Sequence, residues 1–303
     1  MFPLVHHPDY SLRQDADTSG TTRFPWDKYT LVRDLLRADR DPPVEHEAPL
    51  MPVEWVNAVH DSHYVDEVMR AEVPAEKARR IGFSITERLA RRALRTSGGT
   101  WMAARLALDR GYAANGAGGS HHALFDTGAG YCIFNDLAIA AHRLLAEKRV
   151  QHVLIVDLDV HQGDGTASLL AGRADVTTFS IHAEKNFPAR KAQSTLDVAL
   201  PDATGDDAYL DALEHHLPRL IDSSAPDLIL YQAGVDVHGE DRLGRLALSD
   251  IGLVARDSFV GGLARKRGIA LASALGGGYG TDQHAVARRH ADAMRVLAMS
   301  YYQ

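Results

Sequence analysis

The feature that most constrains the fold is a repeated alternation of short aliphatic runs with longer amphipathic segments. The runs lie near residues 2–6, 152–157, 176–180, 227–232 and 269–275. Nearly continuous apolar runs of this length are typical of strands that are buried on both faces. Amphipathic segments between such strands are typical of crossover helices. The alternation therefore predicts an α/β fold with a mostly parallel sheet and helices on both of its faces.

Eight helices are predicted from the same pattern. They are expected at 27–38, 84–96, 99–110, 135–147, 165–171, 207–221, 249–266 and 282–298. Asn135 and Ser249 precede two of them and suit N-caps, because short polar side chains accept hydrogen bonds from free N–H groups of the first turn. The Pro- and acid-rich segment 41–54 is expected to be a surface excursion. No linker is apparent, so we expect one domain over residues 1–303.

Composition narrows the setting. The formal net charge of −7 gives no support for binding to nucleic acid or to an anionic membrane. No apolar stretch reaches the roughly 18 residues of a membrane-spanning helix, and the N-terminus lacks a signal-peptide pattern. Cys132 is the only cysteine, and its apolar neighbours predict a buried thiol, not a nucleophile. We therefore expect a cytoplasmic protein without nucleic-acid or membrane partners.

The stretch VDLDVHQGDG, residues 156–165, places acids and a histidine directly after an aliphatic run. A lone buried carboxylate costs roughly several kcal/mol unless it is paired or coordinates a metal. Asp157, Asp159 and His161 are spaced by two, so an extended backbone points all three toward one face. Carboxylate and imidazole ligands suit Zn²⁺, and three protein ligands with an open position are typical of catalytic zinc. Asp236 also follows an apolar strand and is the candidate third ligand, although an acid there also suits a turn or a helix cap.

Two adjacent histidines lie in the glycine-rich stretch GGSHHALFDTGAGYCIFND, residues 118–136. Adjacent side chains on an extended backbone point in opposite directions, but glycines allow a turn that brings both to one site. Asp157 and Asp164 are available to pair with His121 and His122. Such pairing fixes the tautomer of each ring and raises its basicity. The pattern predicts general acid–base groups beside the metal.

The stretch LGGGYG, residues 275–280, lacks the GxGxxG spacing of a dinucleotide site. Its glycines let backbone approach a substrate closely and leave the phenol of Tyr279 able to face a developing oxyanion. The alternative is a turn with a buried tyrosine.

In this order, the motifs GGSHHA, GYCIFND, VDLDVHQGDGT, YQAGVD and LGGGYG resemble the zinc-dependent histone deacetylase superfamily, whose fold is shared with arginase. The stretches FSIHAEKNFPARK and VALPDATGDDAYL, with HPDYSL and RFPWDKY near the start, most resemble its class IV branch and bacterial relatives. The resemblance spans essentially the whole chain, and it implies the arginase/deacetylase fold.

The resemblance also implies a role for individual residues. The implied zinc ligands are Asp159, His161 and Asp236. The implied catalytic residues are His121 backed by Asp157, His122 backed by Asp164, and the carbonyl-polarising Tyr279. A structural K⁺ or Na⁺ is implied at Asp157, Asp159, His161, Ser180 and Ile181. The implied acyl-lysine tunnel is lined by Gly130, Tyr131, Phe187 and Gly277, with Tyr131 standing where the family usually has phenylalanine.

These residues predict zinc-dependent hydrolysis of an N-acyl amide, with an acylated lysine on a protein or peptide as the expected substrate. His122 is the first choice for the group that takes a proton from water, and His121 is the alternative. A small-molecule amidohydrolase, such as an acetylpolyamine deacetylase, would use the same metal site. A non-catalytic acyl-lysine binding module would not need the proton-transfer groups. A binuclear manganese ureohydrolase would need more acids around Asp236 than GVDVHG offers.

Overall fold

A central parallel sheet organises the chain. The structure is a computed structural model that describes residues 1–12 and 24–302, so Arg23 of the RFPWDKY segment lies outside the described residues. The described residues form an eight-stranded sheet in the order β2-β1-β3-β8-β7-β4-β5-β6, with every neighbouring pair parallel. The strands are β1 (Pro3–His6), β2 (Val44–Glu47), β3 (Tyr112–Asn115), β4 (Val153–Asp157), β5 (Val176–Ala183), β6 (Leu196–Leu200), β7 (Leu228–Gln232) and β8 (Ala270–Ala274). The predicted parallel α/β architecture is confirmed.

The order of the strands brings distant segments together. After β3, the chain passes over the positions of β8 and β7 to form β4, and those two strands later fill the gap. The carboxyl ends of β3, β8, β7 and β4 are therefore neighbours at one edge of the sheet. In open α/β sheets, ligands bind in the crevice beyond this edge. The ends of these four strands and the loops after them carry the candidate ligands, the histidines and Tyr279, whereas Ser180 and Ile181 lie in β5 and Phe187 follows it.

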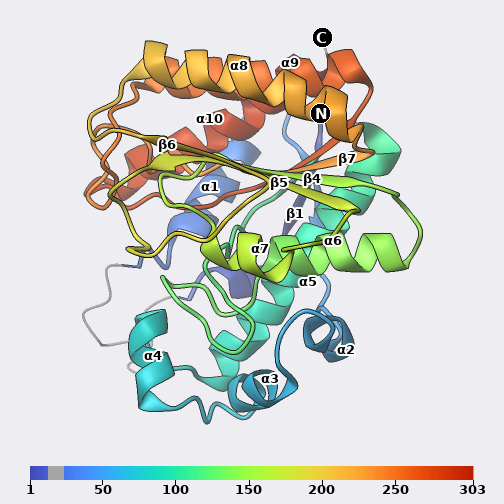
Figure 1. The fold of residues 1–303 in the computed structure, drawn as a ribbon, viewed down its shortest axis with the longest axis vertical. Coiled ribbons are helices and arrows are strands. Elements are labelled where there is room, and N and C mark those ends of the chain that lie inside the picture. The colour runs from blue at the N-terminus through green and yellow to red at the C-terminus, as the bar shows by residue number, and fades with distance from the viewer. Residues whose placement is uncertain (13–23, 303) are drawn as a thin grey trace.

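Helices cover both faces of the sheet, as predicted. In Figure 1, α8, α9 and α10 lie on one side of the sheet and α5, α6 and α7 on the other, with α2, α3 and α4 beyond α5. The bounds are α1 (Lys28–Arg37), α2 (Val53–Asn57), α3 (Ser62–Met69), α4 (Ala75–Ile81), α5 (Glu87–Arg110), α6 (Asp136–Ala146), α7 (Asp164–Leu169), α8 (Asp206–Ser224), α9 (Asp250–Arg267) and α10 (Gln283–Tyr302). Asn135 and Ser249 cap α6 and α9, accepting from the N–H groups of Ala138 and Gly252.

Two predictions about elements were wrong. The predicted helices 84–96 and 99–110 are one helix, α5, which continues through Gly98 and Gly99. These glycines serve close packing, because a Cβ on Gly98 would clash with the Pro49 carbonyl and one on Gly99 with the Tyr10 hydroxyl. Part of the predicted excursion 41–54 is the edge strand β2, which is largely exposed.

The strands that the sequence did not indicate are short or lie at an edge. β3 has the sequence YAAN, without a β-branched residue, and β6 is an edge strand that is only partly buried. The five predicted strands, β1, β4, β5, β7 and β8, are almost entirely buried, as expected for a parallel sheet between helical layers. A second apolar cluster joins α2, α3 and α4 to α5 beside the main core. No helix among the described residues is both long and apolar enough to span a membrane.

Candidate active site

The turn after β4 presents two of the candidate ligands. All five residues of β4 are buried, and the backbone leaves the sheet at Asp157. Its carboxylate accepts from the N–H of Asp159 at 3.2 Å, and Asp159 accepts from the N–H of His161 at 3.0 Å. Each of these side chains thus holds the backbone of the next, which explains why residues spaced by two share one site.

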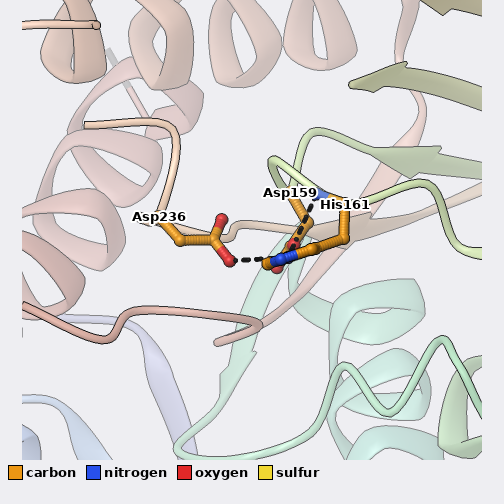
Figure 2. A group of neighbouring side chains, drawn as sticks. All are labelled: Asp159, His161 and Asp236. Carbon is orange, nitrogen blue, oxygen red and sulfur yellow. Dashed lines mark hydrogen bonds and ion pairs between the residues drawn. The ribbon is translucent and has the colours of Figure 1, made fainter. Parts of the chain in front are cut away.

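Asp236 completes a compact cluster with Asp159 and His161 (Figure 2). One potential ligand atom from each residue lies within 4.8 Å of the others. His161 Nδ1 is 3.0 Å from Asp159 Oδ1 and 3.2 Å from Asp236 Oδ2. The structure therefore brings together the three residues predicted from separate motifs.

The charge balance of this cluster suits a divalent cation. Asp159 and Asp236 are buried, and Asp236 Oδ2 has no hydrogen-bond partner. Burial, followed by repulsion from Asp159, raises the pKa of Asp236 to about 7. Burial opposes a charge on His161, but its hydrogen bond to Asp159 and the nearby negative charge of Asp236 raise its pKa to about 10. The positive charge of protonated His161 thus balances part of the negative charge of Asp159 and Asp236. A metal ion bound by the same three residues would supply this positive charge instead.

Gly277, after β8, closes the other side of the cluster. Its N–H donates to Asp159 Oδ2 at 2.7 Å. A Cβ at this position would clash with Asp236 Oδ2, so the backbone can approach both acids only because the residue is glycine. The glycine-rich motif thus shapes the metal-ligand cluster itself.

The two histidines face two separate acids. His121 Nδ1 is 2.7 Å from Asp157, and His122 Nδ1 is 2.7 Å from Asp164. The ring centroids of His121 and His122 are 4.1 Å apart, so the turn expected at this loop brings both rings to one place. The structure therefore contains the two imidazole–carboxylate pairs, and in each pair Nε2 is the nitrogen not engaged by the acid.

The two imidazoles differ in charge. Burial would lower the pKa of His121, but the carboxylates of Asp157 and Asp159 outweigh it and raise that pKa to about 9. Burial, followed by repulsion from His121, lowers the pKa of His122 to about 3. At neutral pH, His121 is cationic and His122 is a neutral ring able to accept a proton.

The loop that carries the histidines depends on residues that sequence reasoning did not identify as part of the site. Asp136 accepts from the N–H of Gly119 at 3.0 Å and from the N–H of Ser120 at 2.6 Å. Gln232, at the end of β7, donates to the Gly119 carbonyl at 2.9 Å. Asp136 stands in the motif GYCIFND, but only its buried contacts reveal this role.

A cavity of about 470 Å³ opens above this site. The four predicted tunnel residues line it: Gly130, Tyr131, Phe187 and Gly277. Tyr131 has a left-handed backbone (φ 68°), and its ring stacks on Phe83 with centroids 6.2 Å apart. Its ring also lies 5.8 Å from that of Tyr279, which lines the same cavity. The aromatic walls suit the aliphatic part of a side chain.

Two buried cations lie in the inner wall, and sequence reasoning missed both. Lys28, at the start of α1, is 2% exposed and donates to the Gly276 carbonyl at 3.0 Å. Burial lowers its pKa to about 8, although the charges of Asp236 and Asp159 favour its protonated form. Arg92 of α5 donates to the Tyr10 carbonyl and lies over the ring of Tyr29. Arg92 lies in the arginine-rich segment 79–95, but only the tertiary structure reveals that it and Lys28 are buried in the cavity wall.

Arg256 of α9 connects the two loops that carry the metal-ligand cluster. Its Nη1 donates to the Gly234 carbonyl at 2.6 Å and lies 3.3 Å from the Leu158 carbonyl. These carbonyls are close in sequence to Asp236 and Asp159 respectively. Arg256 therefore sets the spacing of the loops after β4 and β7.

The remaining site residues lie behind the cluster. Asp157 pairs with Ser180 in the register of β4 and β5, and Ile181 follows in β5. The side chain of Ser180 is hydrogen-bonded to His182 Nδ1 at 2.9 Å. Cys132 is buried, and burial raises the pKa of its thiol well above the usual range, as expected for a thiol that is not a nucleophile.

The sequence that forms this ligand cluster, these histidine pairs and this cavity also matches a known protein family. Residues 24–296 match the Histone deacetylase domain. The chain belongs to the histone deacetylase family. It is thus a deacetylase-family hydrolase, a class that acts on amides, and the resemblance seen in the motifs is confirmed.

Individual relatives of this histone deacetylase family chain cover nearly its whole length. It is 42% identical over 291 residues to an uncharacterized protein of Picosynechococcus sp., covering 95% of this chain and 96% of the relative. It is 28% identical over 319 residues to a probable deacetylase of Methanothermobacter thermautotrophicus, covering 99% and 92%. A crystal structure of acetylpolyamine aminohydrolase from Burkholderia pseudomallei has the same fold, with a TM-score of 0.79, 22% identity and coverage of 99% and 98%.

Proposed function

We propose that the protein is a zinc-dependent hydrolase of N-acyl-lysine amides on proteins or peptides. The observation that carries the proposal is the position of the ligand cluster Asp159, His161 and Asp236 beside two histidine–aspartate pairs in one cavity. A binding module would gain nothing from two such pairs. Metal-dependent hydrolysis uses both a bound metal and a proton-transfer group, and this site provides residues for each.

Zinc is the metal that we assign to Asp159, His161 and Asp236. Two carboxylates and one imidazole suit Zn²⁺, and three protein ligands leave a position for substrate or water. When bound, zinc polarises an amide carbonyl and lowers the pKa of water from about 15.7 toward about 7. The unpartnered Oδ2 of Asp236 and the counter-charge role of His161 support this assignment.

His122 is assigned the proton transfer. Asp164 engages its Nδ1, so Nε2 can accept a proton from the attacking water and deliver one to the leaving amine. Its lowered pKa keeps the ring neutral before the reaction. His121, held cationic by Asp157, supplies positive charge beside the developing oxyanion.

Tyr279 is assigned the stabilisation of the carbonyl oxygen. Its phenol has a pKa raised well above the ordinary value by burial and by the carboxylates of Asp159 and Asp236, so it remains a donor. Gly130, Tyr131 and Phe187 would surround the aliphatic lysine chain. We further propose a structural K⁺ or Na⁺ at Asp157, Asp159, His161, Ser180 and Ile181, where it would offset the acids, and membership in the class IV branch. The lone buried thiol is consistent with action in the cytoplasm.

A second candidate is the hydrolysis of small acylated amines. The solved neighbour is described as an acetylpolyamine aminohydrolase, and it has the same fold. The inner site would serve either substrate, because both present an N-acyl amide on an alkyl chain. The candidates differ only in what lies beyond that chain.

The purified protein, reloaded with zinc after chelation, should be assayed on peptides with acetyl- to myristoyl-lysine and on acetylpolyamines. We expect one zinc per chain and zinc-dependent release of the acyl group from lysine peptides. Absence of stoichiometric metal binding, together with no amide cleavage after zinc is added, would refute the proposed function. Turnover of polyamines alone would overturn the lysine assignment in favour of the second candidate.

A further inference from the structure

The open end of the cavity carries an excess of positive charge. Three exposed residues that line the cavity form a cationic rim, consisting of Arg80, Lys185 and Arg245. They come from α4, from the segment after β5 and from the segment between β7 and α9. Among the described cavity-lining residues the only acid is Asp159, which belongs to the metal-ligand cluster. This positive rim contrasts with the net charge of −7 of the whole chain.

Two of the three rim charges are not neutralised locally. Among the described residues, Arg80 and Lys185 have no carboxylate within ion-pair distance, whereas Arg245 Nη1 lies 2.9 Å from Asp202 Oδ2. Glu184 precedes Lys185 but does not line the cavity. Exposed, unpaired cations attract anions over roughly one Debye length, which is about 10 Å at 0.1 M salt.

The direction of substrate binding places the rest of the substrate at this rim. The scissile amide must reach Asp159, His161 and Asp236 at the inner end, so the alkyl chain extends along the aromatic walls toward solvent. In an acetylpolyamine, the groups beyond that chain are ammonium ions, which the rim repels. In an acyl-lysine peptide, these groups are the backbone and the flanking side chains, whose charge depends on the sequence.

We propose that the cationic rim selects acyl-lysine substrates flanked by acidic residues and disfavours acylated amines that carry an ammonium group beyond the alkyl chain. This inference rests on the proposed function, since it concerns the substrate of that same site. The rim provides charge complementarity at the entrance, where an electrostatic effect acts mainly on association. The inner cations Lys28 and Arg92 do not take this role, because both are buried in the inner wall of the cavity.

The test uses three acetyl-lysine peptides of equal length, flanked by Asp, Asn or Lys on both sides, and N-acetylputrescine. Binding of fluorescently labelled peptides is followed by anisotropy, and hydrolysis is followed as kcat/KM at low salt. We expect affinity and kcat/KM to fall from the Asp to the Asn to the Lys peptide, by about three- to tenfold across the series. We expect N-acetylputrescine to be a poorer substrate than the Asn peptide. The difference in affinity and in kcat/KM between the Asp and Lys peptides should shrink in 1 M salt.

The decisive variant is Arg80→Gln/Lys185→Gln, which removes the two unpaired rim charges. Because both residues are exposed, the variant should fold normally, and the ratio between the Asp and Lys peptides should fall to about twofold or less. The matched control Arg70→Gln/Lys266→Gln removes two exposed cations that do not line the cavity and should keep the wild-type ratio.

The outcomes separate this inference from the proposed function. Equal binding of the three peptides, or an unchanged ratio in the rim variant, would overturn the role of the rim even if the Asn peptide is hydrolysed. Failure to hydrolyse the Asn peptide in the presence of zinc counts against the proposed function. In that case, the order of binding affinity of the three peptides, measured by anisotropy, still tests the role of the rim.

Discussion

Two clusters of buried charged side chains, one around Arg256 and one around Asp159 and Asp236, differ in how their charges are compensated. On α9, Arg256 is paired with Asp257 at 2.9 Å, and Tyr231 donates to the same carboxylate at 2.6 Å. At the ends of β4 and β7, the charged partners of Asp159 and Asp236 among the described residues are imidazole rings, with His161 close to both acids and His121 Nε2 3.8 Å from Asp159, and Asp236 Oδ2 accepts no hydrogen bond. The first cluster is complete without a ligand, and the second is not.

This difference distinguishes a structural from a functional use of buried charge. A buried ion pair is tolerated when its hydrogen bonds are satisfied, and removing one partner is strongly destabilising. Buried acids without sufficient partners cost stability, and a chain gains from them only when a ligand compensates the charge. The two clusters are physically connected, because Arg256 donates to carbonyls in both loops of the incomplete one.

The largest effect is expected on breaking the incomplete cluster with Asp236→Asn. The variant should lose bound zinc and at least about 10³-fold in kcat/KM, because one of three ligands is weakened. The zinc-free variant should nevertheless be as stable as zinc-free wild type, or more stable, because a buried charge without sufficient partners becomes neutral. Metal analysis and urea unfolding with a chelator measure both. A loss of several kcal/mol in the zinc-free variant would contradict the comparison.

Breaking the complete cluster should instead lower the stability of the fold, whether or not zinc is bound. Arg256→Met leaves Asp257 buried and unpaired, and it should lower the free energy of unfolding by about 3–5 kcal/mol with or without zinc. Urea unfolding of the zinc-free and zinc-loaded forms measures this loss. The control Arg256→Met/Asp257→Leu removes both charges and should recover part of the stability. A loss below about 1 kcal/mol in the single variant would show that the pair is not structural.

The next effect is expected at Tyr279, to which we assign the stabilisation of the carbonyl oxygen and which belongs to neither charge cluster. Tyr279→Phe should lower kcat by about 10²–10³-fold, with zinc content and unfolding unchanged, because one oxyanion donor is lost. Tyr131→Phe removes the neighbouring phenol of the same cavity and should change kcat by less than about threefold. Similar losses in both variants would argue against a specific role for Tyr279.

The smallest effect concerns Lys28, a buried cation near the incomplete cluster. Its pKa is lowered by burial from 10.5 to about 8, so the unfolded chain binds more protons between these values and stability rises with pH across this window. Compared with Lys28→Met, zinc-free wild type should therefore gain about 2 kcal/mol between pH 8 and pH 10. Urea unfolding of both proteins at several pH values measures this difference. If the free energy of unfolding changes with pH in the same way in both proteins, Lys28 has an ordinary pKa in the folded state.

The candidate site could be predicted to a large extent, because its residues lie in short motifs with strong local geometry. Asp157 ends β4, and Asp159 and His161 lie in the bends that follow, so hydrogen bonds from side chain to backbone in this turn, not an extended backbone, bring Asp159 and His161 to one site. The pairing of His121 with one acid and His122 with another requires that the loops after β3 and β4 meet, although β8 and β7 lie between these strands in the sheet. The supporting residues could not be found in this way. Asp136 matters only through contacts with a loop 16 or 17 residues away.

The sequence by itself determined the parallel α/β class, the buried central strands and the acids, histidines and glycines at their carboxyl ends. These features are local, because periodicity and backbone extension act over a few residues. Only the tertiary structure decided that α5 continues through its glycines, that Lys28 and Arg92 are buried beside the site, and that Arg256 joins two loops. The physical reason is that burial and charge compensation depend on which distant segments meet.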